Sequence, residues 1–332
     1  MICYENDSTD PAFNMAVEEA LLISAGREPL FLLWENAPAV IVGRHQNVWS
    51  EVNLSYARQE KIRVIRRLSG GGAVYHDSGN LNYTFIVPIE SGRSKKSVEP
   101  DFKFWSKPII NVLNQVGVDA QFSGRNDLTV EGKKFSGTAQ VRVGGHLLHH
   151  GTLLFSTDFD KMNRLLTVDP EKFNSKGVSS VKARVANLSD YLPTSIGKTR
   201  FKKLLLDELS KETDLTFKRF SIRQLETIRR LKREKYDTPS WNLGQSPRSD
   251  FHREKRFVWG KLRVDVTLEK GTLSKLDFSG DFFSDGDISN FTRRLISAEF
   301  TREELGHRIS ETDLKSVFPA MEKDEFISFL FD

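Results

Sequence analysis

The chain has 332 residues, of which 38% are hydrophobic and 28% are charged, a balance typical of a soluble globular protein. Its 49 basic and 45 acidic residues leave a net charge of +4, which is too small to indicate nucleic acid as the partner. No stretch approaches the roughly 18 apolar residues that a membrane-spanning helix requires, so we expect no contact with a membrane.

The amino-terminal residues and the cysteine content indicate a reducing, cytoplasmic location. Glu5, Asp7 and Asp10 precede the first arginine, which is unlike a signal or transit peptide. The single cysteine, Cys3, excludes an intrachain disulfide and a multi-cysteine zinc site, and it precedes the first predicted element. We therefore expect a cytoplasmic protein without a cysteine nucleophile, and we expect it to be a monomer.

The first part of the chain predicts a helix, two strands and a second helix. Ser8–Pro11 combines a capping side chain with proline in the first turn, and an apolar stripe follows. Leu30–Trp34 and Val40–Val42 are short apolar runs typical of buried strands. The polar stretch Gly43–Asn47 then forms a loop at a strand end, where binding sites are common. Asn53–Lys61 predicts a short helix.

Ile62–Val87 is the stretch in which we expect a site. A β-branched run with Arg66 and Arg67 leads into three consecutive glycines, Gly70–Gly72, and strand-like sequence resumes after them. Consecutive glycines weaken a strand, so their usual purpose is close approach of the backbone to another group. Two neighbouring guanidinium groups indicate that this group is an anion. A glycine bulge at a sheet corner is the alternative that involves no ligand.

The following residues predict a helix and two hairpins. Pro100–Val116 carries apolar residues at helical spacing, and Leu128–Gln140 and Val141–Phe155 each contain a glycine turn between strand-like halves. Because these strands have few helices between them, we expect an α/β (α+β) fold with a mixed, largely antiparallel sheet and flanking helices.

The residues after the hairpins predict three helices and a long loop. Lys161–Leu166, Arg200–Glu212 and Ile222–Tyr236 have helical patterns. Ser175–Asn187 has no period and holds three basic residues, so it predicts a long loop, a feature that is often functional in compact domains.

A domain boundary is predicted at Trp241–Pro247, where the composition shifts to glycine, serine and proline. The residues after it predict a strand meander over Arg256–Val266 and Gly271–Phe278. We therefore expect a large domain of residues 1–245 and a small α+β domain of residues 246–332. The helices predicted in the small domain are Ile288–Phe300, Thr301–Ile309 and Lys323–Leu330.

Several common motifs are absent or incomplete. The glycines form no Walker A sequence and open no helix, so neither a P-loop nor a dinucleotide fingerprint is present, and Gly-x-Ser-x-Gly is missing. His146, His149 and His150 alternate between strand faces without a nearby carboxylate or thiolate, which favours hydrogen-bonding histidines over zinc. Asp281–Asp287 lacks the ligand positions of a calcium loop and predicts a turn.

Lys133 and Lys134 follow the tip of the first predicted hairpin. Their side chains face opposite sides of a strand, so one is solvated while the other can enter a pocket. Taken alone, these two residues favour the simpler interpretation of surface lysines beside a turn.

Six motifs in this chain occur together in a characteristic order and spacing. They are GRHQN (Gly43–Asn47), RRLSGGGAVYHDSGNLN (Arg66–Asn82), GRNDL (Gly124–Leu128), KKFSGTA (Lys133–Ala139), HHGTLL (His149–Leu154) and KGVSSVKARVANL (Lys176–Leu188). The set closely resembles the lipoate–protein ligase A family of the biotin/lipoate ligase superfamily. The resemblance runs nearly end to end and includes the C-terminal module that this family often carries.

The resemblance implies an ATP-dependent ligase. Lipoate is adenylated to lipoyl-AMP with release of pyrophosphate, and the lipoyl group then passes to a lysine of an acceptor protein. Lys134 is implied as the catalytic residue and Arg67 as an ATP contact, while the loop Lys176–Arg184 would cover the adenylate and exclude water. The residues implied to bind ATP or lipoyl-AMP are Arg67, Ser69, Gly71, Gly72, Ala73, Val74, Tyr75, His76, Asn80, Asp127, Lys134, Gly137, Thr152, Lys176 and Arg184, and those implied to bind lipoate are Arg67, Gly72, Lys134 and His149.

The resemblance also implies cofactors and partners. Mg²⁺ should accompany ATP, with no protein ligands assigned. The acceptors would be lipoyl domains of 2-oxoacid dehydrogenase E2 subunits or the glycine cleavage H protein. The lipoyl tail requires an apolar tunnel, for which we expect residues near Leu33, Val42 and Val74. At about 0.8 kcal/mol per buried methylene, octanoate should be accepted as well.

Other functions remain to be separated from this one. Octanoyl transferases and lipoyl amidotransferases of the superfamily use a cysteine, which the predicted core lacks. A lipoyltransferase that uses preformed lipoyl-AMP and a non-catalytic lipoate- or nucleotide-binding protein stay open as alternatives.

Overall fold

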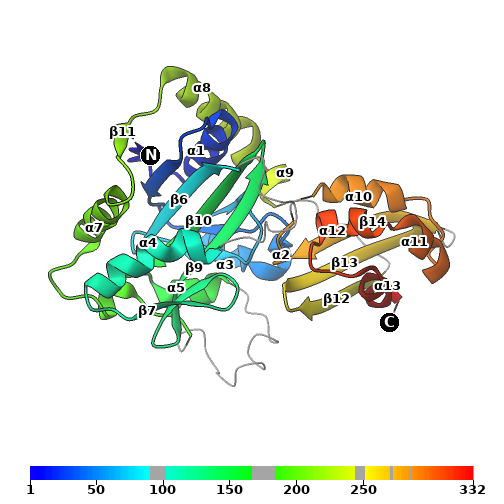
Figure 1. The fold of residues 1–332 in the computed structure, drawn as a ribbon. Coiled ribbons are helices and arrows are strands. Elements are labelled where there is room, and N and C mark those ends of the chain that lie inside the picture. Colours follow the sequence, from blue (N-terminus) through cyan, green and yellow to red (C-terminus); the bar gives the residue numbers. More distant parts are fainter. Residues whose placement is uncertain (90–101, 167–183, 244–250, 270–271, 285, 332) are drawn as a thin grey trace.

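The computed structural model describes residues 1–332 except 90–101, 167–183, 244–250, 270–271, 285 and 332 (Figure 1). The predicted loop Ser175–Asn187 lies mostly outside the described residues, as do Lys176 and most of the predicted domain boundary. No helix in the described part of the chain is long and apolar enough to cross a membrane.

The large domain is built on an eight-stranded sheet with the order β11-β1-β2-β6-β10-β9-β8-β7. Only the pairs that β1 makes with β2 and β11 are parallel, and the other neighbours are antiparallel. The predicted mixed, largely antiparallel sheet is therefore confirmed. The strands are β1 (Ile2–Tyr4), β2 (Leu30–Trp34), β6 (Asn80–Pro88), β7 (Ala120–Ser123), β8 (Asp127–Val130), β9 (Lys133–Val143), β10 (His146–Leu154) and β11 (Thr216–Lys218).

A small three-stranded sheet, ordered β4-β3-β5, lies beside it and contains β3 (Ala39–Val42), β4 (Arg63–Arg66) and β5 (Val74–His76). The predicted glycine stretch Gly70–Gly72 forms the connection between β4 and β5 and lies outside any strand. β4 pairs with β3 in parallel and β5 pairs with it antiparallel, so the glycine connection crosses the end of β3.

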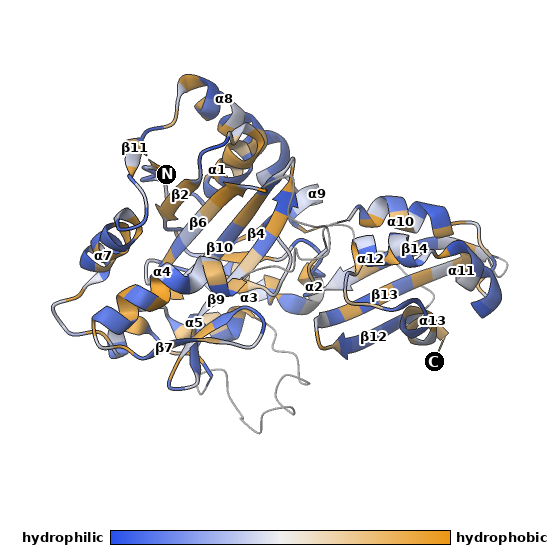
Figure 2. Cartoon of the chain, viewed as in Figure 1, coloured by the Kyte–Doolittle hydropathy of each residue, from blue (hydrophilic) through white to orange (hydrophobic). Residues whose placement is uncertain are grey.

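Helices cover both faces of the large sheet (Figure 1). α4 (Phe102–Gln115) and α7 (Lys198–Ser210) pack on one face over Tyr83 and Phe85, while α1 (Pro11–Ser24) and α8 (Ile222–Leu231) pack on the other. In Figure 2 hydrophobic residues run along the central strands between these layers. The shorter helices are α2 (Val48–Glu51), α3 (Leu54–Gln59), α5 (Phe159–Leu165), η1 (Leu188–Asp190), η2 (Lys232–Tyr236) and α9 (Pro239–Asn242).

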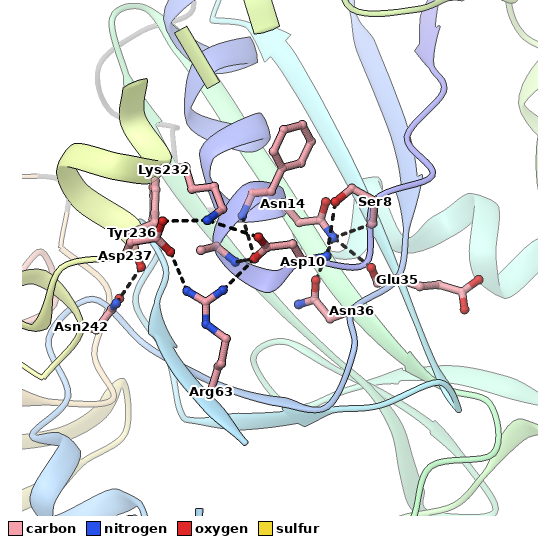
Figure 3. Close-up of polar contacts among 12 residues, drawn as sticks. Ser8, Asp10, Asn14, Glu35, Asn36, Arg63, Lys232, Tyr236, Asp237 and Asn242 are labelled. Carbon is pink, nitrogen blue, oxygen red and sulfur yellow. Dashed lines mark hydrogen bonds and ion pairs between the residues drawn. The ribbon is translucent and has the colours of Figure 1, made fainter. Parts of the chain in front are cut away.

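The start of α1 confirms the predicted cap. The Asp10 carboxylate accepts hydrogen bonds from two backbone N–H groups of the first turn, which would otherwise lack partners. It also pairs with Arg63 at 2.9 Å and with Lys232 at 3.3 Å, and Asp237 bridges the same two cations (Figure 3). This network joins α1, β4 and η2.

The C-terminal domain has its own sheet and its own core. The antiparallel meander is β12 (Phe251–Phe257), β13 (Gly260–Glu269) and β14 (Thr272–Gly280), so the predicted strand Arg256–Val266 is interrupted by a turn at Val258-Trp259. These turn residues are apolar, so no polar turn signal marks them. The helices are α10 (Ile288–Leu295), α11 (Arg302–Arg308), α12 (Glu311–Val317), which the sequence did not predict, and α13 (Lys323–Phe331).

The segment predicted as a turn, Asp281–Asp287, begins the contact between the two domains. Gly280 N–H donates to the His45 carbonyl oxygen at 2.8 Å, and the rings of His45 and Phe282 stack with centroids 4.8 Å apart. A Cβ on Gly70 would lie 2.2 Å from the Phe282 carbonyl oxygen. The glycine connection of the large domain is therefore in direct backbone contact with the C-terminal domain.

Candidate active site

A cavity of about 760 Å³ lies between the small sheet, strands β6, β9 and β10, and the C-terminal domain. This cavity brings together residues from five of the six sequence motifs, all except Gly43–Asn47. The predicted site residues that line it are Arg67, Gly71, Gly72, Ala73, Val74, His76, Asp127, Lys134, Gly137, Thr152 and Arg184.

Arg67 organises the glycine connection. Its Nη2 donates to the carbonyl oxygens of Gly70 at 2.6 Å and Gly72 at 2.9 Å, and its Nη1 donates to the Ile41 carbonyl at 3.2 Å. Its Nε donates to Ser69 Oγ at 3.0 Å. Burial lowers the pKa of Arg67 to about 10, so the guanidinium stays charged at neutral pH. The loop conformation therefore depends on one buried cation.

Glycine is required at two positions here. Gly71 has φ +86°, a backbone conformation that other residues adopt only with strain. A Cβ on Gly43 would lie 1.9 Å from the Gly71 carbonyl oxygen. The sequence predicted that these glycines allow the backbone to lie close to an anion. In the structure, part of this close contact is with the protein's own backbone. Binding of an anion therefore stays a prediction.

Arg66 points away from the cavity. Its Nη1 donates to the carbonyl oxygens of Gly43, Arg44 and Gln46 at 2.8–3.1 Å, and its Nε donates to that of Trp241 at 3.0 Å. Of the two adjacent arginines, Arg67 alone lines the cavity, while Arg66 joins the 43–46 loop to α9.

Lys134 lies on β9 in a position fixed by its backbone. Its N–H donates to the Arg184 carbonyl oxygen at 2.7 Å, and its own carbonyl accepts from Ala186 N–H at 2.9 Å. Its Nζ pairs with Asp127 Oδ1 at 2.8 Å, and its side chain is 39% exposed, so the ammonium is half-buried. A Cβ on Gly137 would lie 2.9 Å from Nζ, so the lysine occupies space that glycine leaves open.

A buried hydrogen-bond series supports Arg67 from behind. Glu18 lies 2.9 Å from His150 Nδ1, and His150 Nε2 lies 2.6 Å from Ser69 Oγ, which accepts from Arg67. Thr84 donates to Glu18 at 2.6 Å. Because the Glu18 carboxylate only accepts hydrogen bonds, His150 Nδ1–H donates to it. The order Ser–His–Glu resembles a hydrolase triad, but Ser69 is fully buried and does not line the cavity, so the series positions Arg67.

Four predicted site residues do not line the cavity. Tyr75 and His149 point to the opposite side of their strands from Val74 and His150, because side chains alternate along a strand. His149 packs instead against Tyr83, Phe85 and Phe102 in the core beneath α4. Ser69 and Asn80 are fully buried, and Lys176 lies outside the described residues. Of the expected tunnel residues, Val74 lines the cavity, while Leu33 and Val42 pack in other parts of the core.

Comparisons with known families agree with this arrangement. Residues 10–210 match the family model of the lipoyl protein ligase A/B catalytic domain, and residues 246–330 match that of the bacterial lipoate protein ligase C-terminus. The chain belongs to the lipoate–protein ligase family.

Curated members of this family match over the whole length. The chain is 36% identical to lipoate–protein ligase 1 of Staphylococcus aureus over 98% of both chains. It is 34% identical to the lipoate–protein ligase LplJ of Bacillus subtilis over 100% of both chains. The predicted family and an enzyme of the ligase class are therefore confirmed.

Several solved structures share the fold, among them two lipoate–protein ligases. P. falciparum LipL1 in complex with lipoate is 25% identical, with a TM-score of 0.77 over 99% of this chain and 98% of that one. A bi-partite ligase of Thermoplasma acidophilum, studied with its E2 lipoyl domain, is 27% identical, with a TM-score of 0.66 over 75% and 98%. A lipoate–protein ligase A bound with ATP is 25% identical, with a TM-score of 0.64 over 73% and 98%.

The ligase cavity has a charged part and an apolar part. Five cationic side chains line it in the described portion of the chain, against two carboxylates, Asp127 and Asp281. The sequence motifs contain His150 and Arg125 but assigned them no role at the site, and Glu18 and Arg256 lie outside the motifs. The cations are Arg67, Arg125, Lys134, Arg184 and Arg256, and the apolar side chains are Met15, Trp34, Ile41, Ala73, Val74, Ala139, Val185, Phe257 and Val258.

Buried histidines beside the cavity make the fold sensitive to acid. Burial lowers the pKa of His76 and of His149 to about 3, and an amide of Asn36 or Gln140 donates to Nδ1 of each ring. In the unfolded chain a histidine titrates near 6.5. Below that pH the unfolded state binds protons that the folded state does not, so stability falls as the pH falls from about 6.5 toward 3.

We expect the free energy of unfolding to be lower at about pH 5 than at about pH 7.5 by about 2 kcal/mol for each of these two histidines. Urea unfolding at both pH values measures this difference. His149→Gln should reduce the difference by about 2 kcal/mol, whereas His307→Gln, at an exposed position on α11, should not change it. Equal pH dependence in wild type and His149→Gln would contradict the assignment of a buried neutral His149.

Proposed function

We propose that this ligase adenylates lipoate with ATP and transfers the lipoyl group from lipoyl-AMP to a lysine of an acceptor protein. The observation that carries the proposal is the shared cavity: Lys134 and residues 71–74 line one space in which, among the residues that the structure describes, cations outnumber carboxylates. The solved structure of LipL1 in complex with lipoate and that of a lipoate–protein ligase A bound with ATP support the same pair of substrates.

The two halves of the cavity suit the two parts of lipoyl-AMP. The apolar side chains around Trp34 and Ile41 suit the lipoyl tail, while Arg67, Lys134 and the glycine connection suit the carboxylate and the α-phosphate. A carboxylate oxygen attacks the α-phosphorus and pyrophosphate leaves with the electron pair. Lys134 would neutralise the charge that accumulates between these two anions.

Magnesium enters this proposal as part of the nucleotide substrate. The described residues contain no group of three His, Cys, Asp or Glu side chains suited to a metal ion. Asp127 and Asp281, the carboxylates of the cavity, are both paired with cations. We therefore propose that Mg²⁺ binds through the phosphate oxygens of ATP.

The proposal includes the acceptors and the division of labour in the chain. The ligase studied with its E2 lipoyl domain supports lipoyl domains as acceptors, and the glycine cleavage H protein is the second candidate. We assign catalysis to residues 1–245 and an accessory role to residues 246–332, with the monomer as the active form.

Lipoate-dependent exchange of labelled pyrophosphate into ATP tests the adenylation step. We expect exchange that requires lipoate and Mg²⁺, and lipoylation of an added E2 lipoyl domain or H protein. If the protein transfers the lipoyl group from synthetic lipoyl-AMP but shows no exchange, it is a lipoyltransferase. Absence of both reactions would leave only a binding function.

Octanoate should compete with lipoate. Most of its contact is burial of methylene groups against apolar side chains of the cavity such as Trp34 and Ile41, each group contributing about 0.8 kcal/mol. We expect inhibition of lipoylation by octanoate and formation of octanoylated acceptor, detected by mass spectrometry. Lipoylation that is unaffected by saturating octanoate would contradict this expectation.

A further inference from the structure

Two arginines from different domains meet in the wall of the ligase cavity. Arg125 lies in the turn between β7 and β8 of the large domain, and Arg256 lies on β12 of the C-terminal domain. Both line the cavity together with Asp281, which follows β14. Neither arginine was among the residues that the sequence motifs marked for ATP or lipoate.

Asp281 lies between the two guanidinium groups. Its Oδ2 is 3.5 Å from Arg256 Nη1, and its carbonyl oxygen accepts from Arg125 Nη2 at 3.5 Å. A Cβ built on Gly260 would lie 3.1 Å from Asp281 Oδ1 and 3.3 Å from Arg125 Nη1, so these groups surround one point. Asp281 thus contacts both guanidinium groups.

Arg125 is oriented but not saturated. Its guanidinium lies over the ring of Phe283, 4.7 Å from the centroid, and Nη1 is buried without a hydrogen-bond partner in the described part of the chain. Burial lowers the pKa of Arg125, the nearby Asp281 and Asp127 oppose this effect, and Arg256 adds to it by repulsion. A buried N–H donor without a partner and two neighbouring guanidinium groups lower the stability of the folded protein. An anion bound between them would remove both costs.

We propose that Arg125 and Arg256 form an interdomain clamp for the pyrophosphate portion of the nucleotide, with Asp281 as the internal counter-ion that holds them when the site is empty. The inference rests on the proposed adenylation reaction and assigns to the C-terminal domain a direct contact with the leaving group. Guanidinium groups suit this ligand because they bind phosphate oxygens through two parallel N–H donors.

The clamp acts on the leaving group of the first step. When the lipoate oxygen bonds to the α-phosphorus, the bond from that phosphorus to the bridging oxygen breaks and pyrophosphate keeps the electron pair. Charge then builds up on pyrophosphate, where two fixed cations stabilise it. The second step, attack of the acceptor amine on lipoyl-AMP, releases AMP and does not involve this part of the nucleotide.

Binding of inorganic pyrophosphate and of AMP to the full chain, measured by calorimetry, tests the clamp. Arg256→Met and Arg125→Met should each weaken pyrophosphate binding about 10- to 100-fold and leave AMP binding within about twofold. Lys255→Met, at an exposed position on the same strand, should change neither value. Arg256→Lys keeps the charge without the paired donors and should give an intermediate loss.

Asp281→Asn separates a ligand site from a purely structural salt bridge. The amide keeps an oxygen that can accept from Lys261 N–H, as the carboxylate does at 2.5 Å, but it removes the competing negative charge. The clamp predicts tighter pyrophosphate binding in this variant, by about threefold or more. If the salt bridge only holds the domains together, pyrophosphate binding should be weaker in Asp281→Asn as well as in Arg125→Met and Arg256→Met. Weaker binding in Asp281→Asn would overturn the proposal.

Enzyme assays separate failure of the clamp from failure of the proposed function. Lipoate-dependent pyrophosphate exchange should fall in Arg256→Met, while lipoyl transfer from synthetic lipoyl-AMP should stay within about twofold of wild type. The wild-type protein could show no exchange although its pyrophosphate binding depends on both arginines. This result would refute the adenylation proposal but support the anion site. Normal exchange in both arginine variants, with unchanged pyrophosphate binding, would refute the clamp alone.

Discussion

Replacing Lys134 by alanine is expected to lower lipoate-dependent pyrophosphate exchange by about 10²- to 10³-fold, the usual cost of removing one preorganised donor at a developing charge. The side chain is 39% exposed and its strand is held by backbone hydrogen bonds to the Arg184 and Ala186 peptides, which alanine retains. Thermal unfolding should therefore be unchanged. Exchange and acceptor lipoylation, measured separately, show which half-reaction depends on the ammonium.

Lys133→Ala is the matched control for this experiment. Lys133 is the preceding residue of β9, it is exposed, and it does not line the cavity of about 760 Å³. We expect normal activity in this variant. If Lys134→Ala and Lys133→Ala have equal activity, Lys134 has no catalytic role and the assignment of the site must be abandoned.

Replacing Arg67 by methionine is expected to lower the free energy of unfolding of the large domain by about 3–5 kcal/mol and to abolish ligase activity. Methionine fills much of the volume, but the carbonyl oxygens of Ile41, Gly70 and Gly72 and the Ser69 hydroxyl all lose a donor. Unpaired buried carbonyls would drive the glycine connection out of its present conformation. Urea unfolding monitored by circular dichroism measures the loss.

Arg63→Met provides the comparison for Arg67→Met. Arg63 is on β4, its side chain is 41% exposed, and it forms ion pairs with Asp10 and Asp237 at the surface. Its loss should cost less than about 1 kcal/mol. Arg67→Lys should fall close to Arg67→Met because one ammonium cannot reach four acceptors in a plane. A stable, active Arg67→Lys enzyme would show that charge matters more than the hydrogen-bond pattern.

The sequence predicted the elements that have a clear period. Both hairpins of β8–β10 were found from alternation around glycine turns, and α1 was found from the capping residues and proline of Ser8–Pro11. The strands β1, β7 and β11 and the helix α12 were missed. The three strands have only three or four residues, and β1 and β11 pair across most of the large domain, Ile2 with Thr216, so local pattern carries little information about them.

The sequence marked only part of the candidate site, because the rest depends on which side chains the fold brings together. Resemblance marked the glycine connection and Lys134, each within a short contiguous motif, and the structure places Gly71, Gly72 and Lys134 at one cavity. It did not distinguish His149 from His150, because the face of β10 that meets the cavity depends on which helices cover the other face. No pattern in the sequence indicated Glu18 or Arg256. Folding alone brings Glu18 to His150 and Arg256 to Asp281.

The backbone contact between Gly70 and Phe282 restricts how chimaeric ligases can be assembled. Any side chain at position 70 would overlap the carbonyl of residue 282, whatever residue the grafted module carries there, because the atom involved belongs to the main chain. A recombinant enzyme that joins this catalytic half to a C-terminal module from another species must therefore keep glycine at the seam. Exchanging the catalytic half for one with alanine at that site would separate the two halves even if each folded normally.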